Sequence, residues 1–138
     1  MADASRHKHP ATGDTPASER VDAPDHCPAS RAMDLVAHKW TVHILFALHE
    51  AGQPVRFGHL QRAVHPITQK ELTKRLRALE RSGLVHRRVY AEVPPRVEYR
   101  LTRLGASMGG PMKALGNWAI AYAEHVESSR EHYDAVNA

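Results

Sequence analysis

In the segment 68–103, apolar residues first recur with the period of a helix and then alternate with polar residues as in a strand. This order constrains the fold more than any other feature of the chain. Leu72, Leu76 and Leu79 recur at the spacing of a helix that buries one face. From Val85 onward, apolar residues instead alternate with polar ones, which is typical of strands. The segment therefore predicts a helix followed by a β-hairpin.

Residues at both ends mark the bounds of this helix. Thr68, with Glu71 three residues later, matches a capping box, and Gly83 stands where the chain must leave the helix. Glu71 also precedes Arg75 by four residues, so its carboxylate either completes the cap or pairs with that guanidinium. These signals predict a helix over 69–82.

The face of this helix opposite the leucines is polar and basic. Successive residues rotate by about 100° around a helix, which brings one set onto a single accessible side. This set comprises Gln69, Lys70, Thr73, Lys74 and Arg77. Such side chains bind phosphates and base edges, although most charged helical faces are only solvated surface. The charge of the following hairpin favours the nucleic-acid interpretation.

The hairpin is predicted from two runs in which apolar and polar residues alternate, 85–93 and 97–101. Pro94 and Pro95 cannot lie inside a paired strand, so they belong to the turn. Its arginines can follow a phosphate backbone, or Arg96, beside the tip, can enter a minor groove. These arginines are Arg87, Arg88, Arg96 and Arg100. Alone, a basic hairpin is more often inert, but directly after a basic helix it favours DNA.

Basic residues are concentrated in the middle of the chain. The whole chain has 19 Lys and Arg against 15 Asp and Glu, whereas residues 27–124 have fifteen against seven. This positive field favours an anionic partner such as DNA. No stretch approaches the roughly 18 apolar residues of a membrane span, and no signal peptide or lipidation motif opens the chain. We therefore expect a soluble, cytoplasmic protein without a membrane partner.

Composition also separates a tail from a single domain. Residues 1–26 contain no Leu, Ile or aromatic residue, so we expect them to be disordered. The domain is predicted over 27–125, a length that supports one core. Residues 126–138 are expected to form a polar C-terminal tail.

The residues before the basic helix predict its supporting elements. An apolar stripe follows Trp40, and the Ala-Gly-Gln-Pro run at 51–54 ends that helix. The predicted elements are a helix to Ala37, a helix over 39–50, a short strand at 55–57 that pairs with the hairpin, and a short helix over 58–64. A short helix, a turn and a basic helix form a helix-turn-helix. The fold class is therefore α+β, mainly α: a winged helix-turn-helix with a small antiparallel sheet.

A last helix is predicted over 104–125, with the Gly-Gly-Pro run at 109–111 breaking or kinking it near its start. This helix carries more apolar surface than a terminal helix on a small domain needs. We expect it to be a dimerisation helix that packs against a second copy of the chain through Met112, Leu115, Trp118 and Tyr122. A small-molecule pocket at the dimer seam is the alternative meaning of these residues.

Two motifs, Lys39-Trp40-Thr41 and the run 93–99, are specific in combination. With them, residues 27–122 resemble the HxlR-type family of bacterial winged helix-turn-helix regulators, which are similar to MarR-type repressors. The resemblance implies a homodimer on a two-fold symmetric double-stranded DNA operator, with the helix 69–82 in the major groove and Arg96 near the minor groove. The predicted DNA-binding residues are Arg56, Thr68, Gln69, Lys70, Thr73, Lys74, Arg77, Arg87, Arg88 and Arg96.

Two positions depart from the family pattern. Ala37-His38 stands where the family usually has two glycines, and His59 stands where an acidic residue is common. These departures leave the local packing open, but they do not affect the predicted DNA-reading role.

Cys27 is the only cysteine of the chain, and it directly precedes a helix that Pro28 can begin. The positive end of a helix dipole favours a thiolate, and many relatives implied by the resemblance sense oxidants or electrophiles through a cysteine at this place. With one cysteine, oxidation must end in an intersubunit disulfide, a cap by a small thiol, or an adduct. Cys27 is therefore the candidate redox sensor, and an inert, partly buried cysteine is the alternative.

Neither a metal site nor an enzyme is predicted. His38, His43 and His49 do not share a helix face, so the histidines lack ligand spacing within one chain. No phosphate loop, nucleophile elbow or catalytic pair is recognisable, and no cofactor is implied. We predict a homodimeric, sequence-specific repressor released by an oxidant, electrophile or small molecule. The alternatives are a module that binds a protein or structured RNA, and a ligand-responsive regulator in which Cys27 is not the sensor.

Overall fold

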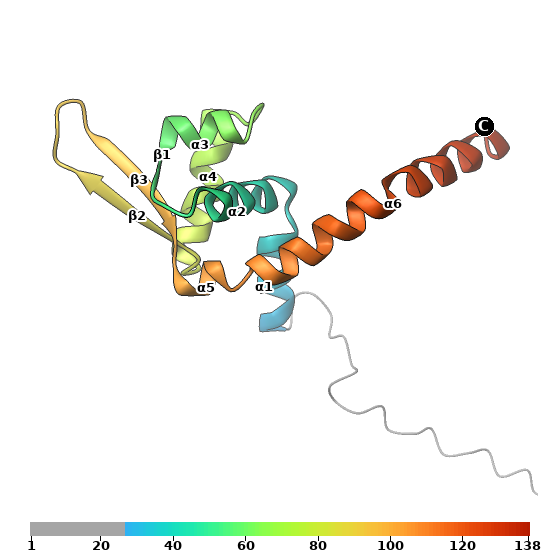
Figure 1. Cartoon of the computed structure of the whole chain (residues 1–138), viewed down its shortest axis with the longest axis horizontal. Coiled ribbons are helices and arrows are strands. Elements are labelled where there is room, and N and C mark those ends of the chain that lie inside the picture. Colours follow the sequence, from blue (N-terminus) through green and yellow to red (C-terminus); the bar gives the residue numbers. More distant parts are fainter. Residues whose placement is uncertain (1–26) are drawn as a thin grey trace, which may run out of the picture. The chain divides into compact units, whose positions relative to one another are not determined.

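The computed structural model describes residues 27–138, so the disorder predicted for residues 1–26 lies outside them (Figure 1). In chain order the elements are α1 (Pro28–Ala37), α2 (Lys39–Ala51), β1 (Val55–Arg56), α3 (Phe57–Ala63), α4 (Gln69–Arg81), β2 (Val85–Tyr90), β3 (Arg96–Leu101), α5 (Arg103–Ala106) and α6 (Gly109–Val136). The chain divides into two units: the first reaches to Ala32 and includes the start of α1, and the second, Met33–Ala138, contains the sheet and the later helices. The predicted class, α+β and mainly α, is confirmed.

The prediction for the last helix is wrong in its bounds. A separate short helix, α5, comes first, and α6 continues beyond His125 to Val136, through most of the predicted polar tail. The break falls at Ser107 and Met108 rather than at the Gly-Gly-Pro run. Pro111 lies in the first turn of α6, where its missing N–H has no helical partner to lose, so this proline starts a helix instead of kinking one.

Helix α2 begins at the position where glycines were expected from the family resemblance. His38 takes an extended conformation, and its Nδ1 accepts a hydrogen bond from the backbone N–H of Trp40 at 3.3 Å. At the other end, Gly52 adopts a positive φ of 60°, and its N–H donates to the Leu48 carbonyl at 3.3 Å. His38 therefore supplies a side-chain N-cap, which glycine cannot supply because it has no side-chain acceptor.

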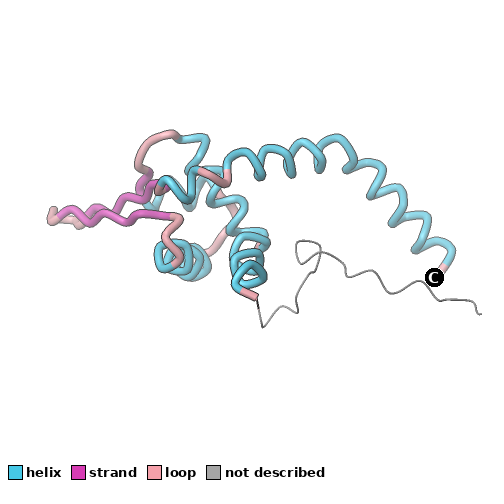
Figure 2. The backbone as a smooth tube through the Cα atoms, turned by 90° about the horizontal axis from the view of Figure 1, so that it is seen from below, coloured by secondary structure: helices cyan, strands magenta, loops and turns pink. Residues whose placement is uncertain are grey.

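The three strands form one antiparallel sheet in the order β1-β3-β2. Strand β2 pairs with β3 along its whole length, from Val85 opposite Leu101 to Tyr90 opposite Arg96. Strand β1 adds Val55 opposite Tyr99, which confirms a third strand, although Phe57, predicted to lie in it, begins α3. Figure 2 shows the hairpin projecting from the helices.

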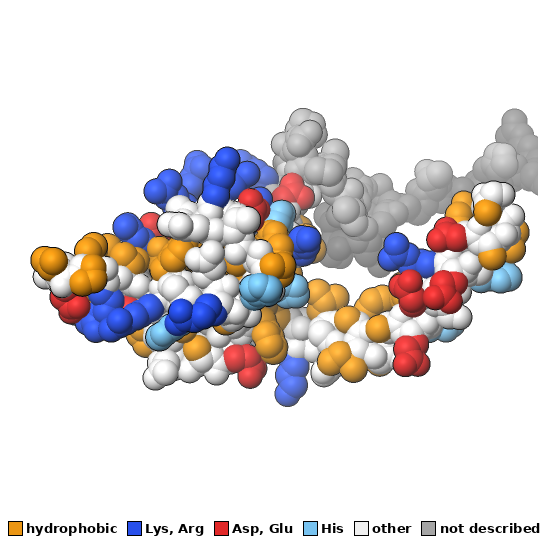
Figure 3. Space-filling model, turned by 90° about the horizontal axis from the view of Figure 1, so that it is seen from above, with side chains coloured by type: hydrophobic (Ala, Val, Ile, Leu, Met, Phe, Trp, Pro, Cys, Tyr) orange, Lys and Arg blue, Asp and Glu red, His pale blue; other side chains and the backbone are white. Residues whose placement is uncertain are grey.

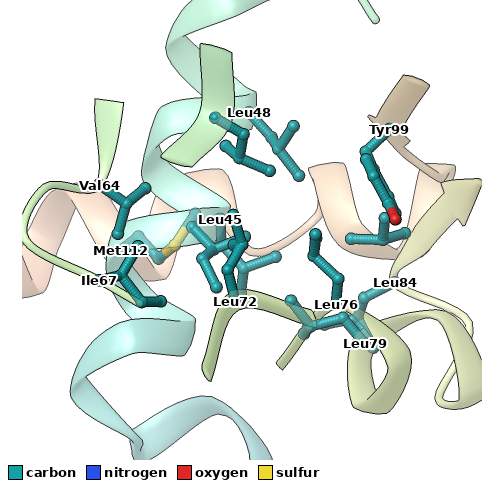
Figure 4. Packing of buried hydrophobic residues seen from close by; sticks show 13 residues of the cluster. Leu45, Leu48, Val64, Ile67, Leu72, Leu76, Leu79, Leu84, Tyr99 and Met112 are labelled. Carbon is teal, nitrogen blue, oxygen red and sulfur yellow. The ribbon is translucent and has the colours of Figure 1, made fainter. Parts of the chain in front are cut away.

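The core lies between α2, α3, α4 and the base of the hairpin (Figure 4). The three leucines of the predicted stripe, Leu72, Leu76 and Leu79, are at most 1% exposed. The other buried hydrophobic residues are Ile44, Leu45, Leu48, Leu60, Val64, Ile67, Leu84, Val85, Tyr99 and Met112. Among residues 27–138, no helix is both long and apolar enough to cross a membrane.

Candidate nucleic-acid interface

The start of α4 is fixed by the predicted cap. The Thr68 hydroxyl accepts a hydrogen bond from the backbone N–H of Glu71 at 3.1 Å. The Glu71 carboxylate does not complete a capping box, because it accepts a hydrogen bond from Arg75 Nε at 2.9 Å. This bond is the main reason that the pKa of Glu71 lies below its ordinary value. Arg75 is therefore occupied on its own helix.

The end of α4 is joined to both ends of the hairpin base. Gly83 takes a φ of 80°, and the next N–H, of Leu84, donates to the Leu79 carbonyl at 3.0 Å. The Thr102 hydroxyl then donates to the Gly83 carbonyl at 2.6 Å and accepts from the Gly105 N–H at 3.1 Å. A Cβ at Gly105 would collide with the Leu84 carbonyl, so only glycine fits there. No structural role was predicted for Thr102 and Gly105 from the sequence. The contacts of Thr102 with Gly83 and of Gly105 with Leu84 are tertiary, whereas the Thr102 cap on Gly105 is local and could have been recognised.

The predicted DNA-reading residues of α4 are gathered on one surface. Thr73 is partly buried and the others are exposed, on the side of the helix away from the three core leucines. One shallow hollow, here called the recognition face, is lined by Thr68, Gln69, Lys70, Thr73, Lys74 and Arg77. All the residues that line this hollow are among the predicted DNA-binding residues. The arrangement offers two amines, a guanidinium, an amide and hydroxyls to one partner.

One member of the recognition face is partly used within the helix. The Thr73 hydroxyl donates to the Gln69 carbonyl at 2.8 Å. Its proton is therefore engaged, and Thr73 presents an acceptor lone pair and a methyl group outward. These groups suit an adenine amino group or a thymine methyl group in a major groove.

The register of the sheet divides the predicted arginines between its two faces. Arg87 pairs with Tyr99, on the face that also buries Val85. Arg88 and Arg96 point to the other face, since Arg88 pairs with Glu98 and Arg96 with Tyr90. Arg56 shares this second face because it also pairs with Glu98. Figure 3 shows Lys and Arg side chains gathered in separate groups and a hairpin tip that is largely hydrophobic.

Arg87 joins the recognition face through a cavity between α4 and the hairpin. The cavity measures about 260 Å³ and is lined by Phe57, Gln69, Thr73, Leu76, Arg77, Glu80, Arg87, Val97 and Tyr99. Burial raises the pKa of the Tyr99 hydroxyl above its ordinary value, and the charge of Arg87 opposes this rise. Arg77 and Arg87 thus face one cavity from two elements, next to the recognition face.

Arg96 is placed beside the hairpin tip, as predicted, but its guanidinium is not free. Its Cζ lies 3.9 Å from the centre of the Tyr90 ring, and Arg88 approaches the same ring at 4.6 Å. Arg96 also pairs with Glu92 at 3.3 Å and with Glu98 at 3.7 Å. We call these five residues the wing clamp. Tyr90 was missed in the sequence, although its place two residues after Arg88 puts both on one strand face.

The predicted dimer-contact residues of α6 separate into two groups. Met112 is only 8% exposed and belongs to the core of its own chain, so including it among the dimer contacts was wrong. Leu115, Trp118 and Tyr122 are each more than half exposed, and the rings of Trp118 and Tyr122 lie 5.7 Å apart. Val126 and Tyr133 extend this exposed stripe at helical spacing.

Cys27 is a free cysteine of intermediate exposure just before α1. Its carbonyl accepts a hydrogen bond from the Arg31 N–H at 3.2 Å, so the residue lies at the N-terminal end of that helix as predicted. Within residues 27–138, no three His, Cys, Asp or Glu side chains gather as metal ligands would.

A helix-turn-helix followed by a hairpin that completes a three-stranded sheet with β1, and with a polar recognition face on the second helix, defines a winged helix-turn-helix protein. Residues 35–127 match the HxlR-like helix-turn-helix family. The chain belongs to this family. It is a transcriptional regulator with a helix-turn-helix fold, and its family relatives are named as such.

Individual relatives agree over most of their length. A protein of Methanothermobacter thermautotrophicus, named as an HTH-type transcriptional regulator, is 42% identical over 105 residues, which cover 76% of this chain and 79% of the relative. The structure of the putative transcriptional regulator ytfH from Salmonella typhimurium is 36% identical with a TM-score of 0.70, covering 78% of this chain and 94% of that chain. The redox regulator HypR in its reduced form is 33% identical with a TM-score of 0.66, covering 74% and 99%.

Proposed function

We propose that this chain binds a two-fold symmetric DNA operator as a homodimer and regulates transcription in response to a chemical signal. The observation that carries this proposal is the recognition face. Its residues lie on the exposed side of α4, opposite the three buried leucines. They line one hollow, and none of them is acidic. A polar surface of this composition suits phosphates and base edges.

The dimensions of α4 fit a major groove. Its 13 residues span roughly 20 Å, and the groove is about 12 Å wide, which admits one helix. Gln69, Thr73 and Arg77 face the bases, and Lys70 and Lys74 reach phosphates. Arg87 binds a phosphate at the edge of the groove, because it faces the same cavity as Arg77. Arg56 and Arg88 lie on the other face of the sheet, away from this surface.

A second copy of the chain covers the exposed stripe of α6. Leu115, Trp118 and Tyr122 are 52–56% exposed, and a row of large apolar side chains on one helix face is typical of an interface between helices. An isologous contact through this stripe yields a two-fold symmetric pair, which matches a symmetric operator. Met112 takes no part because it is buried in its own chain.

Cys27 is the proposed site at which an oxidant or electrophile acts. Similarity to a protein described as a redox regulator supports this signal class, and Cys27 lies at the N-terminal end of α1 with intermediate exposure. Cys27→Ser is expected to bind DNA as the wild type does but to stay bound in diamide or a quinone. If oxidant still releases the variant, Cys27 is not the sensor and a ligand at the dimer seam becomes the better account.

The central experiment is a gel shift with DNA from upstream of the protein's own coding sequence. We expect this duplex to be bound at a concentration where random duplex of equal length is not. Equal affinity for both would overturn sequence-specific regulation. Tighter binding of structured RNA than of either duplex would favour the RNA-binding alternative.

A further inference from the structure

The wing clamp neutralises the outer end of the hairpin. Two arginines, Arg88 and Arg96, are matched there by Glu92 and Glu98, so the clamp carries no net charge. The Arg96 side chain is 28% exposed and its Nε is buried without a hydrogen-bond partner. Both guanidinium groups lie close to the Tyr90 ring. The flat face of the Arg96 guanidinium thus stacks on the Tyr90 ring, and its edge forms ion pairs with Glu92 and Glu98.

Beyond the clamp, the hairpin presents an apolar tip. Val93 is fully exposed at 102%, and Pro94 and Pro95 next to it are exposed as well. Two consecutive prolines restrict the backbone, so a surface made of them loses little conformational entropy on binding. The part of the hairpin that reaches furthest is therefore stiff, apolar and uncharged.

When α4 lies in a major groove, the length of the hairpin determines which part of the DNA its tip can reach. A strand of six residues spans about 20 Å. The neighbouring minor groove lies half a helical turn away, which is about 17 Å for a turn of about 34 Å. Valine and proline side chains fit a groove about 6 Å wide, and apolar wedges of this kind contact minor grooves in other proteins.

We propose that the tip residues Val93, Pro94 and Pro95 contact the minor groove directly, and that Arg96 is a positioning residue whose clamp on Tyr90 holds the tip in place. The inference rests on the proposed DNA-binding function. It differs from the expectation that the Arg96 guanidinium itself enters the groove. The two arrangements differ in charge at the groove, and salt dependence separates them.

The test compares DNA affinity over a range of salt concentrations for the full chain and its variants, on the duplex bound by the wild type. Arg96→Ala and Tyr90→Ala are expected to weaken binding by the same factor, roughly twofold to fivefold, the size of a lost cation–π contact. The double variant should be no weaker than either single variant, and Tyr90→Phe should bind as the wild type does. The Tyr90 variants, which change no charge, should keep the wild-type salt slope, and Arg96→Ala should reduce it by less than one phosphate contact per protomer does.

Hydroxyl-radical footprinting reports the tip itself, because the radical attacks sugars through the minor groove. Val93→Ser should lose protection there and keep the major-groove contacts of α4, with folding checked by circular dichroism. A slope less steep by about one per protomer in Arg96→Ala would mean that the guanidinium contacts DNA, and would overturn the positioning role. Multiplicative losses in the double variant would do the same. A wild-type chain that prefers no duplex would instead refute the proposed function and this inference together.

Discussion

Lys70→Ala tests one proposed phosphate contact of the recognition face. Lys70 is exposed in the first turn of α4, where its charge opposes the helix dipole at a cost of about 0.3–1 kcal/mol. Removing it therefore does not weaken the helix. A weaker affinity of this variant for DNA reports lost contact with DNA rather than lost fold, which a thermal melt can check.

The size of the effect depends on how many copies bind. Each phosphate contact contributes about 0.9 to the slope of log affinity against log salt, so a homodimer that loses two contacts has a slope less steep by about 1.8. Between about 50 and about 200 mM salt, the advantage of wild type over variant then shrinks roughly 12-fold. A monomer that loses one contact gives a change of only about 3.5-fold.

Fluorescence anisotropy with a labelled operator measures these slopes, and Arg75→Ala is the matched control. Arg75 also carries one positive charge on α4, but its side chain is 20% exposed and bonded to Glu71 at 2.9 Å. Its removal should leave the slope unchanged. Equal slopes for Lys70→Ala and wild type, or an equal reduction in both variants, would refute the assignment of the recognition face.

Three further variants probe stability and assembly. Gly105→Ala should lower the free energy of unfolding by about 1–3 kcal/mol in urea melts, because its Cβ collides with the Leu84 carbonyl; an unchanged midpoint would contradict this packing. The pKa of Glu71 is lowered, so the stability from its carboxylate is present above its ordinary pKa and lost as pH falls through the lowered value. In an NMR titration, Arg75→Met should bring that pKa back up, and no change would exclude Arg75 as the cause. Trp118→Ala should sediment as a monomer, and a fully dimeric variant would place Trp118 outside the interface.

The local signals of α4 were sufficient to predict it. Its leucine spacing, the Thr68 cap and Gly83 each act through neighbours a few residues away, so a single sequence contains them. The close approach of Gly105 to the Leu84 carbonyl was not predictable. That contact joins residues distant in sequence and leaves no local pattern.

In the candidate site, too, local sequence signals were sufficient for some residues, whereas contacts between distant residues decided others. Arg87 and Arg88 are adjacent, so alternation alone places them on opposite sheet faces, yet charge alone had grouped them together. The pairing of Arg96 with Tyr90 depends on the register across a turn that is longer than the common two-residue hairpin loops. Because the sequence alone does not show that Tyr90 lies opposite Arg96, Arg96 was predicted to be a free cation beside the tip.

The hairpin is supported by the rest of the domain near its base, and its outer end is free. Its base is held by the bonds that Thr102 makes to Gly83 and Gly105, and by the short pairing with β1, which ends at Glu98. Further out, each strand has only its partner, and Val89 is already 54% exposed. An isolated two-stranded ribbon is marginally stable in water, so the stiffness of the free end has to come from cross-strand side chains rather than from the core. Tyr90 and Arg96 form the outermost strand pair and are stacked, so we expect this contact to contribute most of the stiffness of the free end.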